Sequence, residues 1–343
     1  MRFKVNNTVR ALVICALATV LAGALGQKAL LKQKGSNNFP FRAKPAFIKR
    51  VSVRTNYPGY IASLPINLRG MHGIVISGKS IRGGASPAIT LTDCRDIHIT
   101  KNRLYNSTDV GIRLYNCKNV TIDYNFFMRV STGVYVERSH GGIVVNYNQF
   151  LNMQGPMPRG QFVQFNNVRG ANNSISYNKG ENIQGESHPE DAISLFKSSG
   201  SPQSPIIIKG NWIRGGGPSP SGGGIMLGDN GGSYLTASDN ILVDPGQYGI
   251  AIAGGDHNVV INNIVYARSQ RFTNVGIYVW GQAGQSVTQC TVTGNKIRYS
   301  NRKNNESNCW LAPGTATPAG WGRNTFGAAI GASVLPPVII TYR

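Results

Sequence analysis

Acidic residues are scarce in this 343-residue chain. It contains 14 Asp and Glu against 35 Lys and Arg, a formal charge of +21, and its first carboxylate is Asp93. This balance favours an anionic partner, either an acidic polysaccharide or an anionic cell surface, although a generally basic source proteome would produce the same balance. A nucleic-acid partner is disfavoured, because the sequence contains no recognition fold or basic-aromatic module.

Long apolar runs are also missing, apart from one near the start. Residues 1–26 combine a basic start, the apolar stretch Ala11–Ala22 and the small-residue sequence Ala24-Leu25-Gly26. The apolar stretch is short for a membrane-spanning helix and fits a secretion signal that is cleaved. We therefore expect a secreted protein, periplasmic or extracellular, with no membrane span after cleavage.

Cysteine and histidine are few, with five residues each. Cys290 and Cys309 are the disulfide candidates in an oxidising compartment, and the sequence leaves open whether they are bonded. His188 and His257 have no Cys or His partner at metal-binding spacing, so no metal site is expected there.

What the sequence does contain is a repeated asparagine. Asn102, Asn125 and Asn148 lie 23 residues apart, and further copies follow at intervals of 23 to 33 residues: Asn178, Asn211, Asn240, Asn263 and Asn295. The residue two places later is nearly always apolar, and the residue three places earlier is usually branched. A fixed period with fixed apolar positions indicates a stacked repeat architecture.

Each period has the pattern of one coil of a parallel β-helix. Short runs with two-residue alternation, such as Gly111–Cys117, are separated by turn residues and are too short for helices. Stacking such coils places equivalent residues about 4.8 Å apart. The asparagines then form a ladder of amides, and the 42 glycines supply turns that need a positive φ. The predicted fold is all-β, a single-stranded parallel β-helix of about 9–10 coils.

The coil pattern resembles that of the right-handed parallel β-helix proteins of the pectate-lyase-like superfamily. It is carried by Ile89-Thr90-Leu91, Cys94, Ile97-His98-Ile99, Asn102 and their repeats, over about Gly73 to Tyr299. The resemblance implies a right-handed helix. Superfamily members include lyases, hydrolases and epimerases of polysaccharides, as well as binding proteins. No catalytic residue carries over, because the sequence contains no lyase or polygalacturonase signature.

The pattern divides the chain into four parts. Residues 1–26 form the signal, 27–70 a linker and N-terminal cap, 71–300 the β-helix and 301–343 a C-terminal cap. Caps are needed because both ends of a β-helix expose unpaired strand edges. Trp310, Trp321 and Phe326 are expected to seal the final coil, and we expect a monomer.

Extra residues in the longer periods fall mostly in one turn, just before the Gly-Ile strand of each coil, and a second group follows that strand. Loops on both sides of the same strand predict a groove with that strand as its floor. The first group comprises Met153–Gly160, Ile183–Glu190, Arg214–Gly223 and Tyr266–Asn274, and the second Ser198–Pro205 and Gly281–Ser286.

The outward positions of this floor are predicted to contact a polysaccharide. One row contains Arg113, Tyr135, Gln164, Ser194, Met226, Ala251 and Tyr278, and the next contains Tyr115, Glu137, Asn166, Phe196, Gly228, Ala253 and Trp280. Aromatic and amide side chains suit sugar rings and hydroxyls, which favours Tyr135, Gln164, Tyr278 and Trp280 as ligand contacts. A covered surface beneath the loops is the alternative.

The densest polar cluster, residues 187–199, allows three interpretations. In a lyase, Lys197 is the base that removes the proton beside a uronate carboxylate, and an arginine neutralises that carboxylate. Asp229, one coil away, is expected within reach of Lys197, where it would keep the amine charged and weaken it as a base. The candidate arginines are Arg113, Arg214, Arg268 and Arg271.

In a hydrolase, Glu190, Asp191 and Asp229 supply the paired carboxylates. Glu190 and Asp191 align with glycines of adjacent coils, so open space is expected beside them. In a third interpretation the same carboxylates and Lys197 form a structural ion-pair network. Calcium, common among superfamily lyases, would have only these three carboxylates as ligands, and no other cofactor is expected.

The sequence favours a lyase over a hydrolase, acting on an acidic polysaccharide. It leaves open a non-catalytic glycan-binding protein of a surface or matrix.

Overall fold

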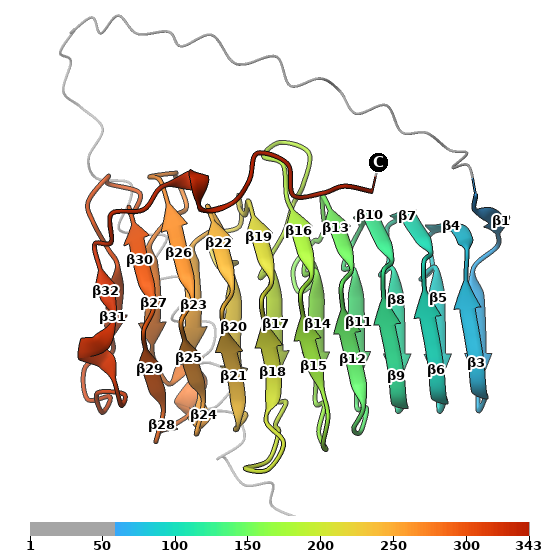
Figure 1. The fold of residues 1–343 in the computed structure, drawn as a ribbon, viewed down its shortest axis with the longest axis horizontal. Coiled ribbons are helices and arrows are strands. Elements are labelled where there is room, and N and C mark those ends of the chain that lie inside the picture. The colour runs from blue at the N-terminus through green and yellow to red at the C-terminus, as the bar shows by residue number, and fades with distance from the viewer. Residues whose placement is uncertain (1–58, 343) are drawn as a thin grey trace, which may run out of the picture. The chain divides into compact units, whose positions relative to one another are not determined.

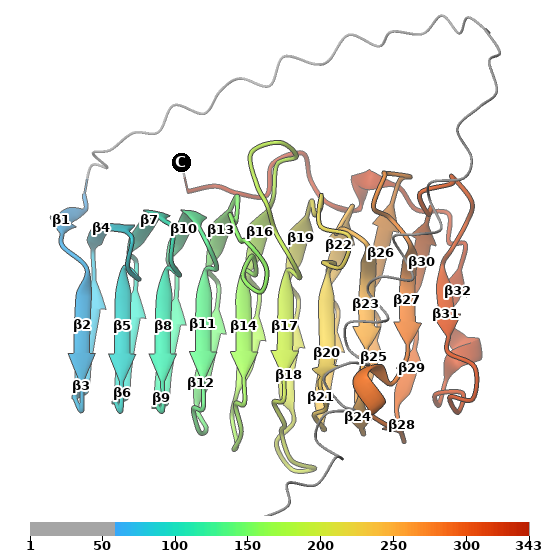
Figure 2. The ribbon, with the colours of Figure 1, turned by 180° about the vertical axis from the view of Figure 1, so that it is seen from behind.

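The fold consists of stacked parallel strands. The structure, a computed structural model, describes residues 59–342, so the predicted signal and most of the predicted linker lie outside the described residues. Three long parallel sheets contain eleven, ten and nine strands, and the chain passes through them in turn, once per coil (Figure 1, and from behind in Figure 2). The predicted parallel β-helix is confirmed, with ten coils counted by the ten strands of the second sheet.

The three sheets are named A, B and C. Sheet A contains β1 (Ile61–Ser63), β4 (Lys79–Gly84), β7 (Arg103–Ser107), β10 (Phe126–Val130), β13 (Gln149–Leu151), β16 (Lys179–Glu181), β19 (Trp212–Arg214), β22 (Ile241–Val243), β26 (Ile264–Ala267), β30 (Lys296–Tyr299) and β32 (Thr325–Phe326). Sheet B contains β2 (Ile66–Arg69), β5 (Ile89–Thr92), β8 (Ile112–Tyr115), β11 (Val134–Glu137), β14 (Val163–Asn166), β17 (Ile193–Phe196), β20 (Ile225–Asp229), β23 (Tyr248–Ile252), β27 (Val275–Val279) and β31 (Cys309–Leu311). Sheet C contains β3 (His72–Ser77), β6 (Arg95–Thr100), β9 (Lys118–Asp123), β12 (Ile143–Asn146), β15 (Ser174–Ser176), β18 (Ile206–Lys209), β21 (Leu235–Ser238), β25 (Val259–Ile261) and β29 (Thr291–Thr293).

A few short elements lie outside these sheets. β24 (Gly255–Asp256) pairs with β28 (Val287–Thr288), and residues 59–342 include the single-turn 3₁₀ helices η2 (Gln282–Gly284), η3 (Trp321–Arg323) and η4 (Ala332–Val334). In the described residues, no helix is long and apolar enough to cross a membrane.

One continuous apolar core fills the space between the three sheets. Each strand alternates, so the aliphatic positions of all three sheets point inward, and Phe127 stacks on Phe150 of the next coil at 4.7 Å between ring centroids. Burying an aliphatic or aromatic side chain contributes about 1.5–3 kcal/mol. Summed over ten coils, this burial stabilises the stack far more than any surface contact.

The predicted asparagine ladder is present. The side-chain N–H of Asn102 donates to Oδ1 of Asn125 at 3.0 Å, and the same bond recurs at every step to Asn295. Each amide also donates to a sheet C carbonyl of the preceding coil, as Asn102 does to the Ile76 carbonyl of β3 at 2.8 Å. Asn324 extends the ladder by one rung beyond the predicted copies, at 2.7 Å from Asn295.

The paired strands extend beyond both boundaries drawn from the sequence. They begin with β1 and β2, before residue 71, and end with β31 and β32, after residue 300. Trp321 and Phe326 pack against the final core, as expected. The prediction for Trp310 is wrong: it lies in β31 on the outer face of sheet B and is 43% exposed, because alternation points it away from the core.

After β32 the chain turns back over the outside of sheet A (Figure 1). Leu335, Ile339 and Ile340 are buried there. The side chain of Gln149 in β13 accepts from the Thr341 backbone at 2.7 Å, and Arg214 in β19 donates to the Pro337 carbonyl at 3.0 Å. Residues 328–342 therefore form a C-terminal strap across sheet A.

All four cysteines of the described residues are free, including Cys290 and Cys309. The Cys290 thiol lies in a turn, where it donates to the Thr288 carbonyl, whereas Cys309 lies in β31.

Candidate functional site

The long loops flank sheet B, as predicted. The first group lies in the turns from sheet A to sheet B, and the second in the turns from sheet B to sheet C. Successive members of the first group contact one another: the His188 backbone N–H donates to the Met153 carbonyl at 2.8 Å, and the Ser221 hydroxyl donates to Glu190. These contacts join the first three loops along the A–B edge of sheet B.

The strand register confirms the first predicted row of outward residues. Tyr135 pairs with Arg113 and Gln164, and Ala251 pairs with Met226 and Tyr278. The second row needs a correction, because Phe196 pairs with Asp229 and not with Gly228. Gly228 has φ 68° and forms a bulge that moves Asp229 into the row.

Tyr135 and Gln164 are covered by a loop side chain. The Arg159 guanidinium carbon lies 3.9 Å from the centroid of the Tyr135 ring, and its Nη1 donates to Gln164 Oε1 at 3.1 Å. Both residues are buried, with 4% and 8% exposure. The alternative of a covered surface therefore describes this part of the floor, and ligand contact here would require Arg159 to move.

Asp191 is buried at the edge of the same face. It accepts hydrogen bonds from the Tyr248 hydroxyl and from the Gly223 backbone N–H at 3.1 Å. A Cβ on Gly223 would lie 2.6 Å from the Tyr248 ring, so the glycine leaves room for Tyr248 to reach across one whole coil. The expectation of open space beside Asp191 is wrong, because Tyr248 fills it.

Burial raises the pKa of Asp191 from 3.8 to about 7. The hydrogen bonds from Tyr248 and Gly223 oppose this rise, whereas the nearby charges of Glu190 and Asp229 add to it. The same burial, together with the Asp191 charge, raises the pKa of Tyr248 well above its ordinary value. Below about pH 7, Asp191 and Tyr248 therefore form a neutral, hydrogen-bonded pair beneath the loops.

The carboxylates do not fit a calcium site. Glu190 is engaged by Ser221, and Asp191 by Tyr248 and Gly223. Within residues 59–342, no three His, Cys, Asp or Glu side chains are grouped so that they could hold a metal ion. Calcium therefore needs at least one further ligand source, and we assign it no role.

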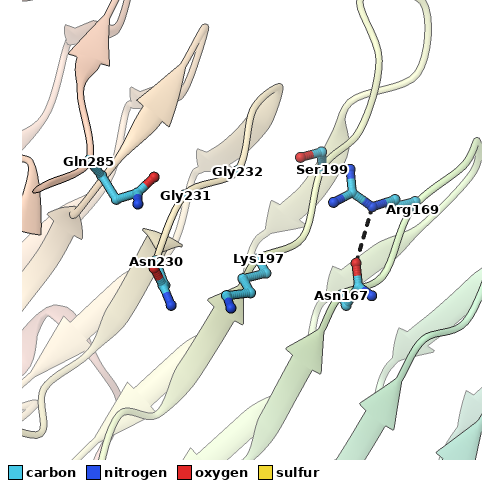
Figure 3. A pocket seen from close by; sticks show the side chains of 8 residues that line it. All are labelled: Asn167, Arg169, Lys197, Ser199, Asn230, Gly231, Gly232 and Gln285. Atoms are coloured by element: carbon cyan, nitrogen blue, oxygen red, sulfur yellow. Dashed lines mark hydrogen bonds between the residues drawn. The ribbon is translucent and has the colours of Figure 1, made fainter. Parts of the chain in front are cut away.

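Lys197 lies at the opposite edge of sheet B, in the turns that lead to sheet C, in an open cavity of about 500 Å³. The cavity is lined by Asn167, Arg169, Lys197, Ser199, Asn230, Gly231, Gly232 and Gln285, which come from the turns after sheet B (Figure 3). Lys197 lies between Asn230 on one side and the hydrogen-bonded Asn167–Arg169 pair on the other (Figure 3). None of these described lining residues is acidic.

The expected ion pair between Lys197 and Asp229 is absent from the described residues, as is any ion pair of Arg169. The Lys197 backbone N–H instead donates to the Asp229 carbonyl at 2.9 Å. Alternation and the bulge explain the difference, because they place Asp229 opposite Phe196 in the ladder. The ion-pair network of the structural interpretation is therefore wrong.

The four candidate arginines are scattered. Arg113 pairs with Glu137 at 3.4 Å, three coils before Lys197, and Arg268 pairs with Asp244 at 3.2 Å. Arg214 lies in sheet A, between Glu181 and the C-terminal strap, and so is not part of the sheet B face. Arg271 lines a separate cavity. The arginine beside Lys197 is Arg169, which the sequence analysis missed.

The C-terminal end of the sheet B face is aromatic. Trp280 is 46% exposed and contacts Trp310 edge to face at 5.9 Å between centroids. Tyr278 is buried beside them, where its hydroxyl accepts from Gln282 Nε2 at 2.8 Å. Trp280 is therefore exposed, so its role as a ligand contact stays a prediction, whereas Tyr278 is covered.

The stacked sheets and the loops along both edges of sheet B define a β-solenoid with cavities beside that sheet. Residues 60–160 match the family model described as right handed beta helix region. With the three parallel sheets, this match identifies the chain as a right-handed parallel β-helix repeat protein. No curated protein sequence matches the chain.

Proposed function

We propose that this β-helix protein binds an acidic polysaccharide at the Lys197 cavity and cleaves it by β-elimination. The observation that carries the proposal is the composition of the cavity: two cations, Lys197 and Arg169, with amide side chains and no acidic residue among the described lining. A guanidinium can neutralise a uronate carboxylate with two parallel hydrogen bonds. We also propose that the protein acts outside the cytoplasmic membrane, as residues 1–26 predict.

The elimination needs one base and one carboxylate partner. The uncharged amine of Lys197 accepts the proton from C5 of the uronate, and the electron pair of that C–H bond forms the C4=C5 double bond. The C4–O glycosidic bond breaks, and the departing oxygen takes a proton back from the ammonium group. Arg169 neutralises the carboxylate, which makes the neighbouring proton easier to remove.

The activity test uses the product's double bond. Purified protein is incubated with pectate, alginate and glycosaminoglycans, and new ultraviolet absorbance reports an unsaturated uronate. Lys197→Ala should abolish this absorbance, a loss of about 100-fold or more for a general base. Lys118→Ala, which removes an equal charge from sheet C, should retain full activity. Full activity in Lys197→Ala rejects Lys197 as the base.

A non-catalytic glycan-binding protein is the second candidate. It is favoured by one observation: apart from Lys197, the described cavity lining offers no Tyr, His, Cys or carboxylate for proton transfer. Retardation in a glycan-loaded gel, with neither absorbance nor new reducing ends, supports this candidate. Hydrolysis has less support, because Asp191 and Glu190 are already engaged within the protein.

A further inference from the structure

A second cavity lies at the opposite edge of sheet B. Its volume is about 390 Å³, and its lining includes Arg271, Phe272, Asn274, Gln247 and Arg302. These residues come from turns between sheets A and B, whereas the Lys197 cavity is formed by turns after sheet B. The turn that precedes β27 therefore contributes to one cavity, and the turn that follows β27 contributes Gln285 to the other.

The second cavity carries unpaired positive charge. Arg271 and Arg302 are exposed, and in the described part of the chain neither forms an ion pair. None of the described lining residues is acidic. Two guanidinium groups on one cavity repel each other, and an oxyanion between them would relieve that repulsion and accept hydrogen bonds from both.

The walls of this cavity are fixed by contacts between coils. The Arg302 backbone N–H donates to the Thr273 carbonyl at 2.8 Å, and that of Asn274 donates to Gln247 at 2.7 Å. The Phe272 ring packs against Gly217, where a Cβ would lie only 2.2 Å away. A ligand would therefore meet a largely preformed site, which lowers the ordering cost of binding.

Aromatic side chains occupy the face between the two cavities. Trp280 lies at the end of β27, and Trp310 lies in β31 beside Tyr278. The five residues of β27 span about 17 Å at ~3.3 Å each. Lys197 follows β17, three coils before β27, which adds about 14 Å along the stack at about 4.8 Å per coil. A path of this length suits a polymer that carries several charged groups, and exposed indole rings suit the apolar faces of sugars.

We propose that the Arg271–Arg302 cavity binds a second oxyanion group of the polysaccharide, a carboxylate or a sulfate ester, so that the bound chain crosses sheet B from this cavity to Lys197. The ligand class rests on the proposed function. The position of the site rests only on the two cavities and the face between them.

The test measures binding of the full chain to polygalacturonate, dextran sulfate and uncharged dextran, each as a long polymer and as a short oligosaccharide. In the double variant Arg271→Gln/Arg302→Gln, affinity for at least one long polyanion should fall about tenfold or more. The affinity of the double variant for the short oligosaccharide of the same polyanion should equal that of the parent protein, because the short chain cannot span the face. Lys303→Gln is the matched control, because Lys303 is exposed and follows Arg302 without lining the cavity. If the double variant fails to fold, Arg302→Gln alone replaces it.

Equal affinity of the variant and the parent protein for both long polyanions overturns the inference, as does an equal loss in Lys303→Gln. The polygalacturonate and dextran sulfate arms distinguish a carboxylate from a sulfate ligand. Binding that depends on Arg271 and Arg302 without any unsaturated product retains this site and rejects the elimination. If the double variant cleaves the polysaccharide and binds it with unchanged affinity, the elimination is retained and this second site is rejected.

Discussion

At the scale of single residues, Asp191 is the most unusual group of the sheet B face. It is buried, its hydrogen-bond partners come from two later coils, and its pKa is raised to about 7. The folded protein therefore holds a proton on Asp191 at pH values where the unfolded chain has released it. Protein stability should then depend on this proton.

Asp191 should lower the stability of the protein as pH rises from about 4 to about 7. Between these values the folded state binds one more proton than the unfolded state, so each step to higher pH favours unfolding, and the effect levels off above pH 7. A pKa change from 3.8 to about 7 corresponds to at most about 4 kcal/mol. Urea unfolding at several pH values measures it.

In the variant Asp191→Asn, the side chain is a neutral amide that does not titrate, so it resembles the protonated carboxyl at every pH. Its stability should match that of the parent protein near pH 4.5 and exceed it at pH 8. Asp239→Asn, which alters an exposed carboxylate paired with Lys209, should keep the parent profile. Parallel pH profiles for Asp191→Asn and the parent protein would contradict the assignment.

At the scale of elements, the C-terminal strap covers the outer face of sheet A. Ile339 and Ile340 are buried, whereas Val338 is 52% exposed. Truncating two buried isoleucines to alanine costs about 4–10 kcal/mol in a well-packed core. Ordering the strap already costs about 1 kcal/mol or more per residue, so this loss is enough to detach it.

The double variant Ile339→Ala/Ile340→Ala should therefore free the chain end without unfolding the coils. Carboxypeptidase should remove the last residues faster, as mass spectrometry can follow, and a dye for apolar surfaces should bind more strongly. Val338→Ala is the matched control and should leave both readings unchanged. Equal digestion rates for the two variants would show that the strap is not held by these side chains.

The sequence predicts those elements that repeat and misses those that do not. The register from β8 to β27 follows from the asparagine period, because equivalent positions of successive coils must pair. The bulge at Gly228 cannot be predicted in this way. Gly228 is one of many glycines in the chain, and nothing in the sequence marks it as the extra residue of a bulge. The strap lies outside the repeat, and its contact between Thr341 and Gln149 spans 192 residues.

The same limit applies to the site. The period predicts which turns flank sheet B, and so predicts the position of Lys197 beside the face. It does not show which side chains cover the face. Arg159 reaches Tyr135 from a loop without a fixed register, and Tyr248, at the start of β23, reaches across a whole coil to Asp191. Arg169 and Trp310 were missed for a related reason: one lies in an ordinary turn, and the other lies in a coil that the pattern did not recognise.

At the scale of the whole molecule, the asparagine ladder connects all coils from Asn102 to Asn324. Oδ1 of Asn148 accepts from the backbone and side-chain N–H groups of Asn125, both at 3.0 Å. Asn148→Ala would leave the buried backbone N–H of Asn125 without this acceptor, at a cost of about 1–3 kcal/mol. The Asn125 side-chain amide would keep the Ile99 and Asp123 carbonyls as acceptors, both at 2.9 Å.

We therefore expect Asn148→Ala to lower the free energy of unfolding by about 1–3 kcal/mol, measured by urea denaturation. Asn305→Ala, which changes an exposed asparagine in a loop, should stay within about 0.5 kcal/mol of the parent protein. A loss no larger than that of Asn305→Ala would show that the ladder contributes no stability at this rung.

The side-chain bonds of the ladder all point the same way, from each asparagine to the one in the following coil. A coil duplicated with its own asparagine would bring one donor and one acceptor and leave both neighbours satisfied. Adding whole coils therefore leaves no donor or acceptor of the asparagine ladder unpaired. An insertion of any other length must be accommodated in a loop. Complete coils added before Asn167 would move both cationic cavities farther from the N-terminal end of the β-helix, without entering the stretch of chain, residues 167–302, that lines them.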